Sequence, residues 1–126
     1  MITEPDSGVA AVLVAFGEAH GWNCAVFSDG DTMTRSLRAA GDPLLLLIDA
    51  DLFDSRFDVV LGTLAALDRP MRLRFATAVN GANVVAAGLM ARARDLSVGP
   101  GLMKPFSPEA LNLMLVRERE ELARFG

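Results

Sequence analysis

The sequence predicts a parallel α/β domain, and two observations carry this prediction. The first is the run of residues 44–48, five consecutive large aliphatic side chains that lead directly into Asp49. A strand that is apolar at every position suits a sheet covered on both faces, as parallel sheets are. The second is that apolar strand-like runs alternate with helical patterns along the whole chain, which is the order of repeated βα units.

Five strands are expected, and most of them are short. Turn-forming residues separate them from the helical segments, such as the Gly41-Asp42-Pro43 break before the aliphatic run. The expected strands are residues 1–3, 23–27, 44–48, 71–77 and 102–103.

The first three expected helices are recognised by their caps and apolar faces. In the first, apolar residues recur at i, i+3, i+4 and i+7, and Gly21 ends the helix. Asp31 or Thr32 is expected to cap the second helix, and Asp54 or Ser55 the third.

Two more helices complete the alternation. Residues 83–94 have a helical pattern after the loop signal of Asn80-Gly81. Ser107 is expected to cap the last helix, with Pro108 at its first position. The charged run at residues 117–121 of that helix is expected to be a solvated face with local ion pairs.

Length and composition exclude several classes of protein. With 126 residues, 52% hydrophobic and 22% charged, residues 1–126 are expected to form one ordered domain. The net charge of -4 argues against a nucleic-acid partner, which calls for a basic surface. The longest apolar run, residues 9–16, is too short to span a bilayer, so no membrane role is expected. A single cysteine and the lack of a visible signal peptide suggest a cytoplasmic protein.

Polar side chains gather at the carboxyl ends of the predicted strands. Right-handed crossovers bring these ends to one edge of the sheet, where α/β domains place their ligand sites. Crowded carboxylates need a cation, and oxygen ligands select a hard ion such as Mg²⁺. A hydroxyl and an ammonium group would complete a pocket for a phosphoryl group on Asp49. The residues concerned are Glu4, Asp6, Asp49, Asp51, Thr77 and Lys104.

This arrangement resembles the receiver domain of two-component response regulators, such as the chemotaxis receiver, over essentially the whole chain. Four pieces carry the resemblance: Glu4-Pro5-Asp6, the aliphatic run ending in Asp49, Ala76-Thr77-Ala78 and Lys104-Pro105-Phe106. The resemblance implies a flavodoxin-like (βα)5 fold, a three-layer sandwich whose five-stranded parallel sheet has the order 2-1-3-4-5.

The resemblance also implies roles for individual residues. Asp49 would be the phosphoacceptor, Thr77 the switch hydroxyl, and Lys104 the cation that pairs with the phosphoryl group. The Lys104-Pro105 bond would be cis, as in the family. Mg²⁺ would be held by Asp49 together with the remaining family positions, which are Glu4, Asp6 and the backbone carbonyl of Asp51.

As a receiver, the protein would act in signal transduction and not as an enzyme. It would be a phosphoprotein of a phosphorelay that takes its phosphoryl group from a histidine kinase or a phosphotransfer protein. A homodimer could form through the face made by the fourth helix, the fifth strand and the last helix, which the family uses for partners.

Departures from the family keep a second reading open. Pro5 falls on the more direct of the two metal-binding positions, and Gly101-Leu102-Met103 stands where the family often has a switch aromatic. The segment from Thr77 to Lys104 is longer than usual by about one helical turn. The alternative is a degenerate pseudo-receiver that binds a partner independently of phosphorylation. An unrelated small α/β enzyme is a distant third, because no nucleophile-base pair or glycine loop supports it.

Overall fold

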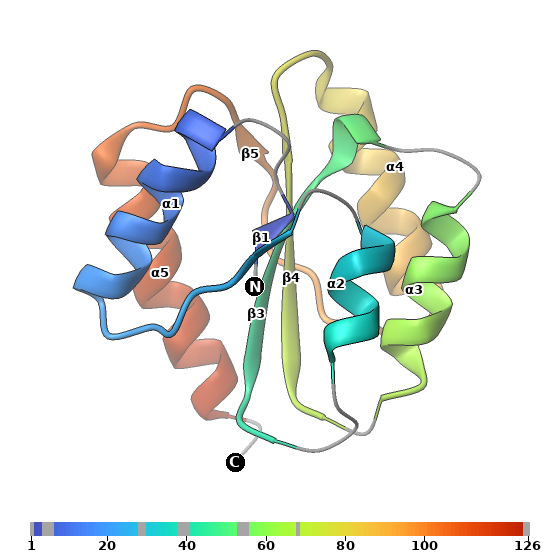
Figure 1. Ribbon diagram of the computed structural model, residues 1–126. Helices are drawn as coiled ribbons and strands as arrows, with labels where there is room; N and C mark the ends of the chain where they lie inside the picture. Colours follow the sequence, from blue (N-terminus) through green and yellow to red (C-terminus); the bar gives the residue numbers. More distant parts are fainter. Residues whose placement is uncertain are drawn as a thin grey trace.

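A single parallel sheet organises the computed structural model, which describes residues 2–3, 7–27, 30–37, 41–52, 56–67 and 69–124. Its strands lie in the order β2-β1-β3-β4-β5 (Figure 1), and every pairing between neighbours is parallel. The strands are β1 (Ile2–Thr3), β2 (Val26–Phe27), β3 (Leu44–Asp49), β4 (Met71–Thr77) and β5 (Leu102–Met103).

Helices cover both faces of the sheet. Figure 1 shows α1 and α5 on one side of the strands and α2, α3 and α4 on the other. The predicted class, an α/β domain with a parallel sheet and five helices, is therefore confirmed. The helices are α1 (Ser7–Ala19), α2 (Gly30–Ser36), α3 (Phe57–Ala65), α4 (Gly81–Arg92) and α5 (Pro108–Ala123), and a short 3₁₀ helix, η1 (Ala50–Leu52), follows β3.

The aliphatic run of β3 supplies both halves of the core. Leu44, Leu46 and Ile48 pack into the cluster shared with α2, α3 and α4. Leu45 and Leu47 belong to the cluster shared with α1 and α5. Because successive side chains of a strand point to opposite faces, a strand between two helical layers must be apolar at every position.

Two helix starts differ from their predicted positions. α2 begins at Gly30, so Asp31 and Thr32 lie inside the helix and not at the position before it. α4 begins at Gly81, and the side chain of Asn80 caps it by accepting a hydrogen bond of 2.9 Å from the backbone N–H of Ala82. Asn80 is thus a helix cap as well as a loop signal, because its short side chain reaches back to the unpaired N–H groups of the first turn.

Other helix ends follow the prediction. Gly21 has a φ of 83° just after α1, and its N–H donates to the carbonyl of Glu18 at 3.0 Å. The left-handed conformation suits glycine, which has no Cβ to clash. Ser107 caps α5 by accepting from the N–H of Ala110 at 3.1 Å, with Pro108 at the first turn. The predicted caps Asp54 and Ser55 lie outside the described residues.

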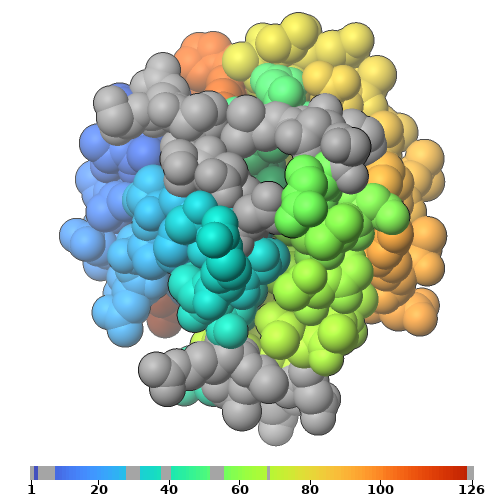
Figure 2. Space-filling model, turned by 45° about the vertical axis from the view of Figure 1, so that its right-hand side comes forward, coloured from blue at the N-terminus to red at the C-terminus, as the bar shows by residue number. Residues whose placement is uncertain are grey.

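Figure 2 looks onto α2 and α3, which lie side by side, with α1 at one edge of the view and α4 at the other. Within the described ranges, no helix is both long enough and apolar enough to cross a membrane.

Candidate functional site

Asp49 and Lys104 form an ion pair at the carboxyl edge of the sheet. Asp49 ends β3 and Lys104 follows β5, and Lys104 Nζ lies 3.0 Å from Asp49 Oδ2. Both side chains are largely buried, with 5% and 9% of their surfaces exposed. The backbone N–H of Lys104 donates to the carbonyl of Thr77 at 2.8 Å, which fixes the lysine against the end of β4. The Lys104-Pro105 bond is cis, as the resemblance implied.

Lys104 is also the single lysine of the sequence, since the other eleven of the twelve cationic residues are arginines. An ammonium group is a compact point charge with rotatable donors, whereas a guanidinium is a rigid planar fork. The one compact cation of the chain is thus placed on Asp49.

The side chain of Asp51 is tied to the start of α4. Its Oδ1 accepts hydrogen bonds from Thr77 Oγ1 at 2.5 Å and from Asn83 Nδ2 at 3.0 Å, and its Oδ2 accepts from the backbone N–H of Ala78 at 2.7 Å. Burial raises the pKa of this carboxyl, but the three hydrogen bonds and the charge of Lys104 outweigh burial and hold the pKa below its usual value. Asp51 is therefore an anion at neutral pH.

Thr77 is fully buried at the end of β4. Its hydroxyl donates to Asp51 and accepts from the backbone N–H groups of Val79 and Asn80, both at 3.1 Å. Thr77 thus contacts Asp51 and not Asp49. The two aspartates are joined directly, because the backbone N–H of Asp51 donates to Asp49 Oδ1 at 2.7 Å.

The structure therefore brings together four of the six residues that the sequence singled out. Asp49 pairs with Lys104, Thr77 pairs with Asp51, and the Asp51 backbone links the two pairs. The predicted metal ligands Glu4 and Asp6 lie outside the described residues. Sequence reasoning missed the role of the Asp51 carboxylate and its partner Asn83, because nothing in their spacing indicates that a loop folds back onto a helix start.

The described half of the predicted metal site has the chemistry that Mg²⁺ prefers. Asp49 presents carboxylate oxygens at the strand edge, and backbone carbonyls such as that of Asp51 are also hard oxygen donors. Within the described residues, no group of three or more acidic, histidine or cysteine side chains could hold a metal ion. The donors present fit an ion that takes one or two protein oxygens and keeps its remaining waters.

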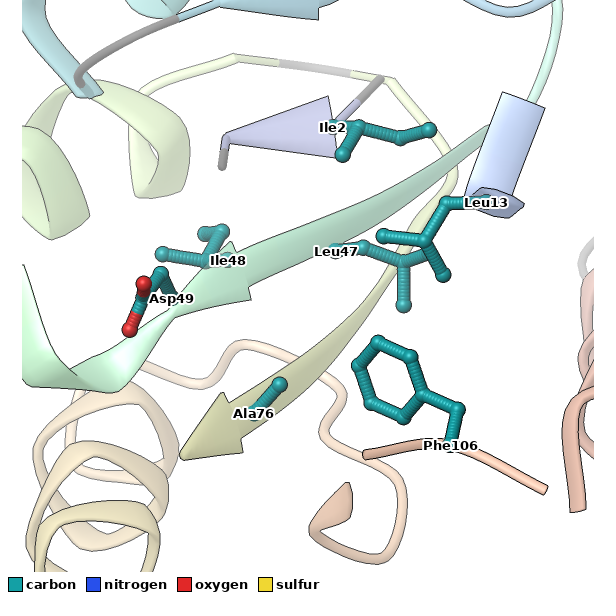
Figure 3. Close-up of a pocket in the computed structure, with 7 residues that line it drawn as sticks. All are labelled: Ile2, Leu13, Leu47, Ile48, Asp49, Ala76 and Phe106. Atoms are coloured by element: carbon teal, nitrogen blue, oxygen red, sulfur yellow. The ribbon is translucent and has the colours of Figure 1, made fainter. Parts of the chain in front are cut away.

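An apolar wall lies behind the carboxylate. Figure 3 shows Leu13, Leu47 and Phe106 gathered together, while the carboxylate of Asp49 points away from them at the tip of β3. Electrostatic interactions are stronger beside such apolar surroundings than in water, so the wall strengthens the attraction between Asp49 and Lys104.

A second charged cluster lies between β4 and α5, and it corrects a prediction. Glu118 of α5 is fully buried, although residues 117–121 were expected to be a solvated face. Its carboxylate accepts from Arg72 Nε and from Arg74 Nε, both at 2.6 Å. A Cβ on Gly99 would lie 2.7 Å from Glu118 Oε1, so glycine is required beside this cluster.

Two signals in the sequence point to this cluster. Glu118 lies three residues after Leu115 and four before Leu122, on the buried side of α5. Arg72 and Arg74 occupy alternate positions of β4, so both face the same helical layer. Buried charges need partners of opposite sign, so two arginines on this face of β4 predict an acidic residue on the helix that covers them.

Known structures share this arrangement of strands and helices. A response regulator from Colwellia psychrerythraea is 20% identical and matches 98% of this chain and 94% of its own with a TM-score of 0.73. The signal receiver domain of a putative Luxo repressor protein from Vibrio parahaemolyticus is 19% identical and matches 99% and 95%, with a TM-score of 0.68. The chain has the receiver-domain fold. The beryllofluoride-activated NtrC4 receiver domain dimer, 17% identical, matches 96% and 95%, with a TM-score of 0.66.

The resemblance to receivers is thus confirmed at the level of the fold. No family model and no curated protein matches the chain. Roles for the residues at the sheet edge therefore rest on their own geometry.

Proposed function

We propose that the protein is the receiver of a two-component system, in which Asp49 accepts a phosphoryl group from a histidine kinase or a phosphotransfer protein. The observation that carries the proposal is the buried pair of Asp49 and Lys104 at the carboxyl edge of the sheet, 3.0 Å apart. A carboxylate nucleophile beside a fixed ammonium donor is what a phosphoryl acceptor needs, because negative charge develops on the transferred group.

The transfer forms one bond to phosphorus and breaks another. A carboxylate oxygen of Asp49 attacks the phosphorus of a phosphohistidine, a P–O bond forms, and the P–N bond breaks with its electron pair going to the imidazole nitrogen. Lys104 then pairs with an oxygen of the phosphoryl group. Asp49 and the Asp51 carbonyl, with Glu4 and Asp6 as the other expected ligands, would hold Mg²⁺, and the ion would neutralise charge on the transferred group. In this proposal the domain is a cytoplasmic switch and not an enzyme.

The signal would leave through the face formed by α4, β5 and α5. β5 is the edge strand of the sheet, and large hydrophobic side chains are exposed on all three elements. Exposed apolar surface of this kind favours a protein partner. A homodimer is our proposal for this face, and the activated NtrC4 receiver is itself described as a dimer. The exposed residues are Val85, Leu89, Met103, Leu113 and Val116.

A second function, the phosphorylation-independent pseudo-receiver, is favoured by one observation. The hydroxyl of Thr77 already has an anionic acceptor in the side chain of Asp51. A switch residue whose hydroxyl is already hydrogen-bonded without a phosphoryl group would stay in one conformation. The face formed by α4, β5 and α5 would then bind its partner constitutively.

The test is binding of beryllofluoride, which mimics an aspartyl phosphate, in the presence of Mg²⁺. We expect the backbone amide NMR signals of Asp49, Thr77 and Lys104 to shift on addition. Asp49→Asn should abolish the shifts, and Asp58→Asn, which removes an exposed carboxylate on α3, should leave them unchanged. Absence of shifts at all three positions in the unmodified protein would overturn the phosphoacceptor role and leave the pseudo-receiver.

A further inference from the structure

We propose that the side chain of Asp51 is a built-in competitor of the phosphoryl group, because it occupies the hydroxyl of Thr77 and the N–H of Ala78. This inference rests on the proposed function and assigns its regulation. Asp51 would hold the unmodified site closed, so that phosphorylation of Asp49 must first displace it.

The register of the sheet puts the contested donors beside Asp49. Asp49 of β3 is the partner of Ala76 in β4, so Thr77 and Ala78 continue β4 past the point where β3 ends. A phosphoryl group on Asp49 extends beyond the end of β3, toward this hydroxyl and this N–H. Two donors that converge on one position form a site for an anion's oxygens.

Asp51 already occupies the same donors. In η1, the backbone N–H of Asp51 donates to Asp49 Oδ1 at 2.7 Å, and this hydrogen bond holds the turn against the end of β3. Its carboxylate then takes Thr77 Oγ1 with one oxygen and the N–H of Ala78 with the other. Both donors are therefore satisfied by an internal anion.

Electrostatic repulsion prevents the Asp51 carboxylate and a phosphoryl group from sharing these donors. A phosphoryl group carries a charge of about -1.5 to -2 near neutral pH. The side chain of Asp51 is a carboxylate, and three donors, the Thr77 hydroxyl, the Ala78 N–H and the Asn83 amide, point at its oxygens. Two anions repel each other at short range, so both cannot occupy these donors.

Displacement of Asp51 would be transmitted to α4. Asp51 Oδ1 also accepts from the side-chain amide of Asn83, which lies in the first turn of that helix. When Asp51 leaves, Asn83 loses its partner along with Thr77. The start of α4 thus senses whether the internal anion or the phosphoryl group holds the donors.

Asp51→Asn tests the competition with little change of shape. The amide keeps the size of the side chain but loses its charge, and its NH₂ group cannot accept from the N–H of Ala78. The matched control is Asp42→Asn, which removes one carboxylate from the exposed turn before β3, at the other end of that strand.

The measurement is the affinity of each protein for beryllofluoride with Mg²⁺, titrated by amide NMR. We expect Asp51→Asn to bind about tenfold more tightly than the unmodified protein, the scale of losing one charged hydrogen bond. Asp42→Asn should bind as the unmodified protein does. A second measurement needs no variant: the side-chain amide signals of Asn83 should move when beryllofluoride saturates the unmodified protein.

The outcomes separate the two ideas. Equal affinity of Asp51→Asn and the unmodified protein, or Asn83 signals that stay in place at saturation, would overturn the competition while the phosphoacceptor role stands. Weaker binding by Asp51→Asn would also overturn it and would point to the Asp51 carboxylate as a helper of the bound ion. Absence of binding by both proteins would overturn the proposed function itself, and the competition with it.

Discussion

The two charged clusters of this protein lie on the same strand, β4, and have opposite imbalances. Between β4 and α5, one carboxylate, Glu118, faces two arginines. Nη1 of Arg72 donates to Ser97 Oγ and Nη1 of Arg74 donates to the carbonyl of Pro100, both at 2.8 Å. The cluster is satisfied internally, so it has no use for a ligand.

At the carboxyl edge the balance is reversed. Two carboxylates, Asp49 and Asp51, share one lysine among the described residues. Anions in excess at a partly buried site must be matched by donors or by an incoming cation. Burial alone therefore does not distinguish the candidate site from the other cluster, whereas the excess of negative charge at the strand ends does. Four substitutions test this difference.

The largest effect is expected at the internal cluster. Glu118→Ala leaves Arg72 and Arg74 without their anion, and breaking a buried pair in this way lowers the free energy of unfolding by about 3–5 kcal/mol. Urea denaturation measures it. Glu120→Ala, on the exposed side of the same helix, should change the value by about 0.5 kcal/mol or less. Similar losses in both variants would show that Glu118 is not structurally special.

Lys104→Gln is expected to affect chemistry more than folding. Removing a donor that stabilises developing negative charge slows a reaction by about 100-fold or more. The effect is measured as the initial rate of phosphorylation by a small phosphoramidate donor, with the phosphorylated protein detected by mass spectrometry of the intact chain. Arg124→Gln, which removes an exposed cation from the end of α5, is the control. An unchanged rate in Lys104→Gln would remove Lys104 from the proposed site.

Asp51 should make stability depend on acid. Its pKa in the folded protein lies below the ordinary value of 3.8. The stability that it supplies is therefore fully present above that value and is lost as the pH falls through the lower folded-state pKa. In metal-free buffer, the difference in free energy of unfolding between the unmodified protein and Asp51→Asn should shrink from about pH 5 to about pH 2. A difference that stays constant with pH would contradict the network around Asp51.

The smallest effect is expected at the surface. Asp58 and Arg94 form an ion pair between α3 and the end of α4, with the Asp58 side chain 61% exposed. Exposed pairs are screened by water and salt, so Asp58→Ala should lower the free energy of unfolding by about 0.5 kcal/mol. Thermal unfolding at low and high salt measures it. A loss as large as that of Glu118→Ala would erase the distinction between buried and exposed pairs.

The sequence was most informative where one local rule decides the outcome. The apolar positions of β3 predict a strand between two helical layers, and Ser107 with Pro108 predicts the start of α5. It was least informative where a side chain chooses among distant partners. Glu118 stands in a charged run that favoured a solvated face, although its spacing from Leu115 and Leu122 is that of the buried side of α5. Its packing against β4 shows that the buried side prevails.

The same division holds at the site. The sequence alone predicts that Asp49, Thr77 and Lys104 lie at one edge of the sheet, because parallel strands bring their carboxyl ends together. Only the tertiary structure decided which of them touch: Lys104 turns to Asp49, and Thr77 turns to Asp51. The strands and helices themselves follow from local patterns, whereas a hydrogen bond is set by ångström-scale positions of loops that no local pattern encodes.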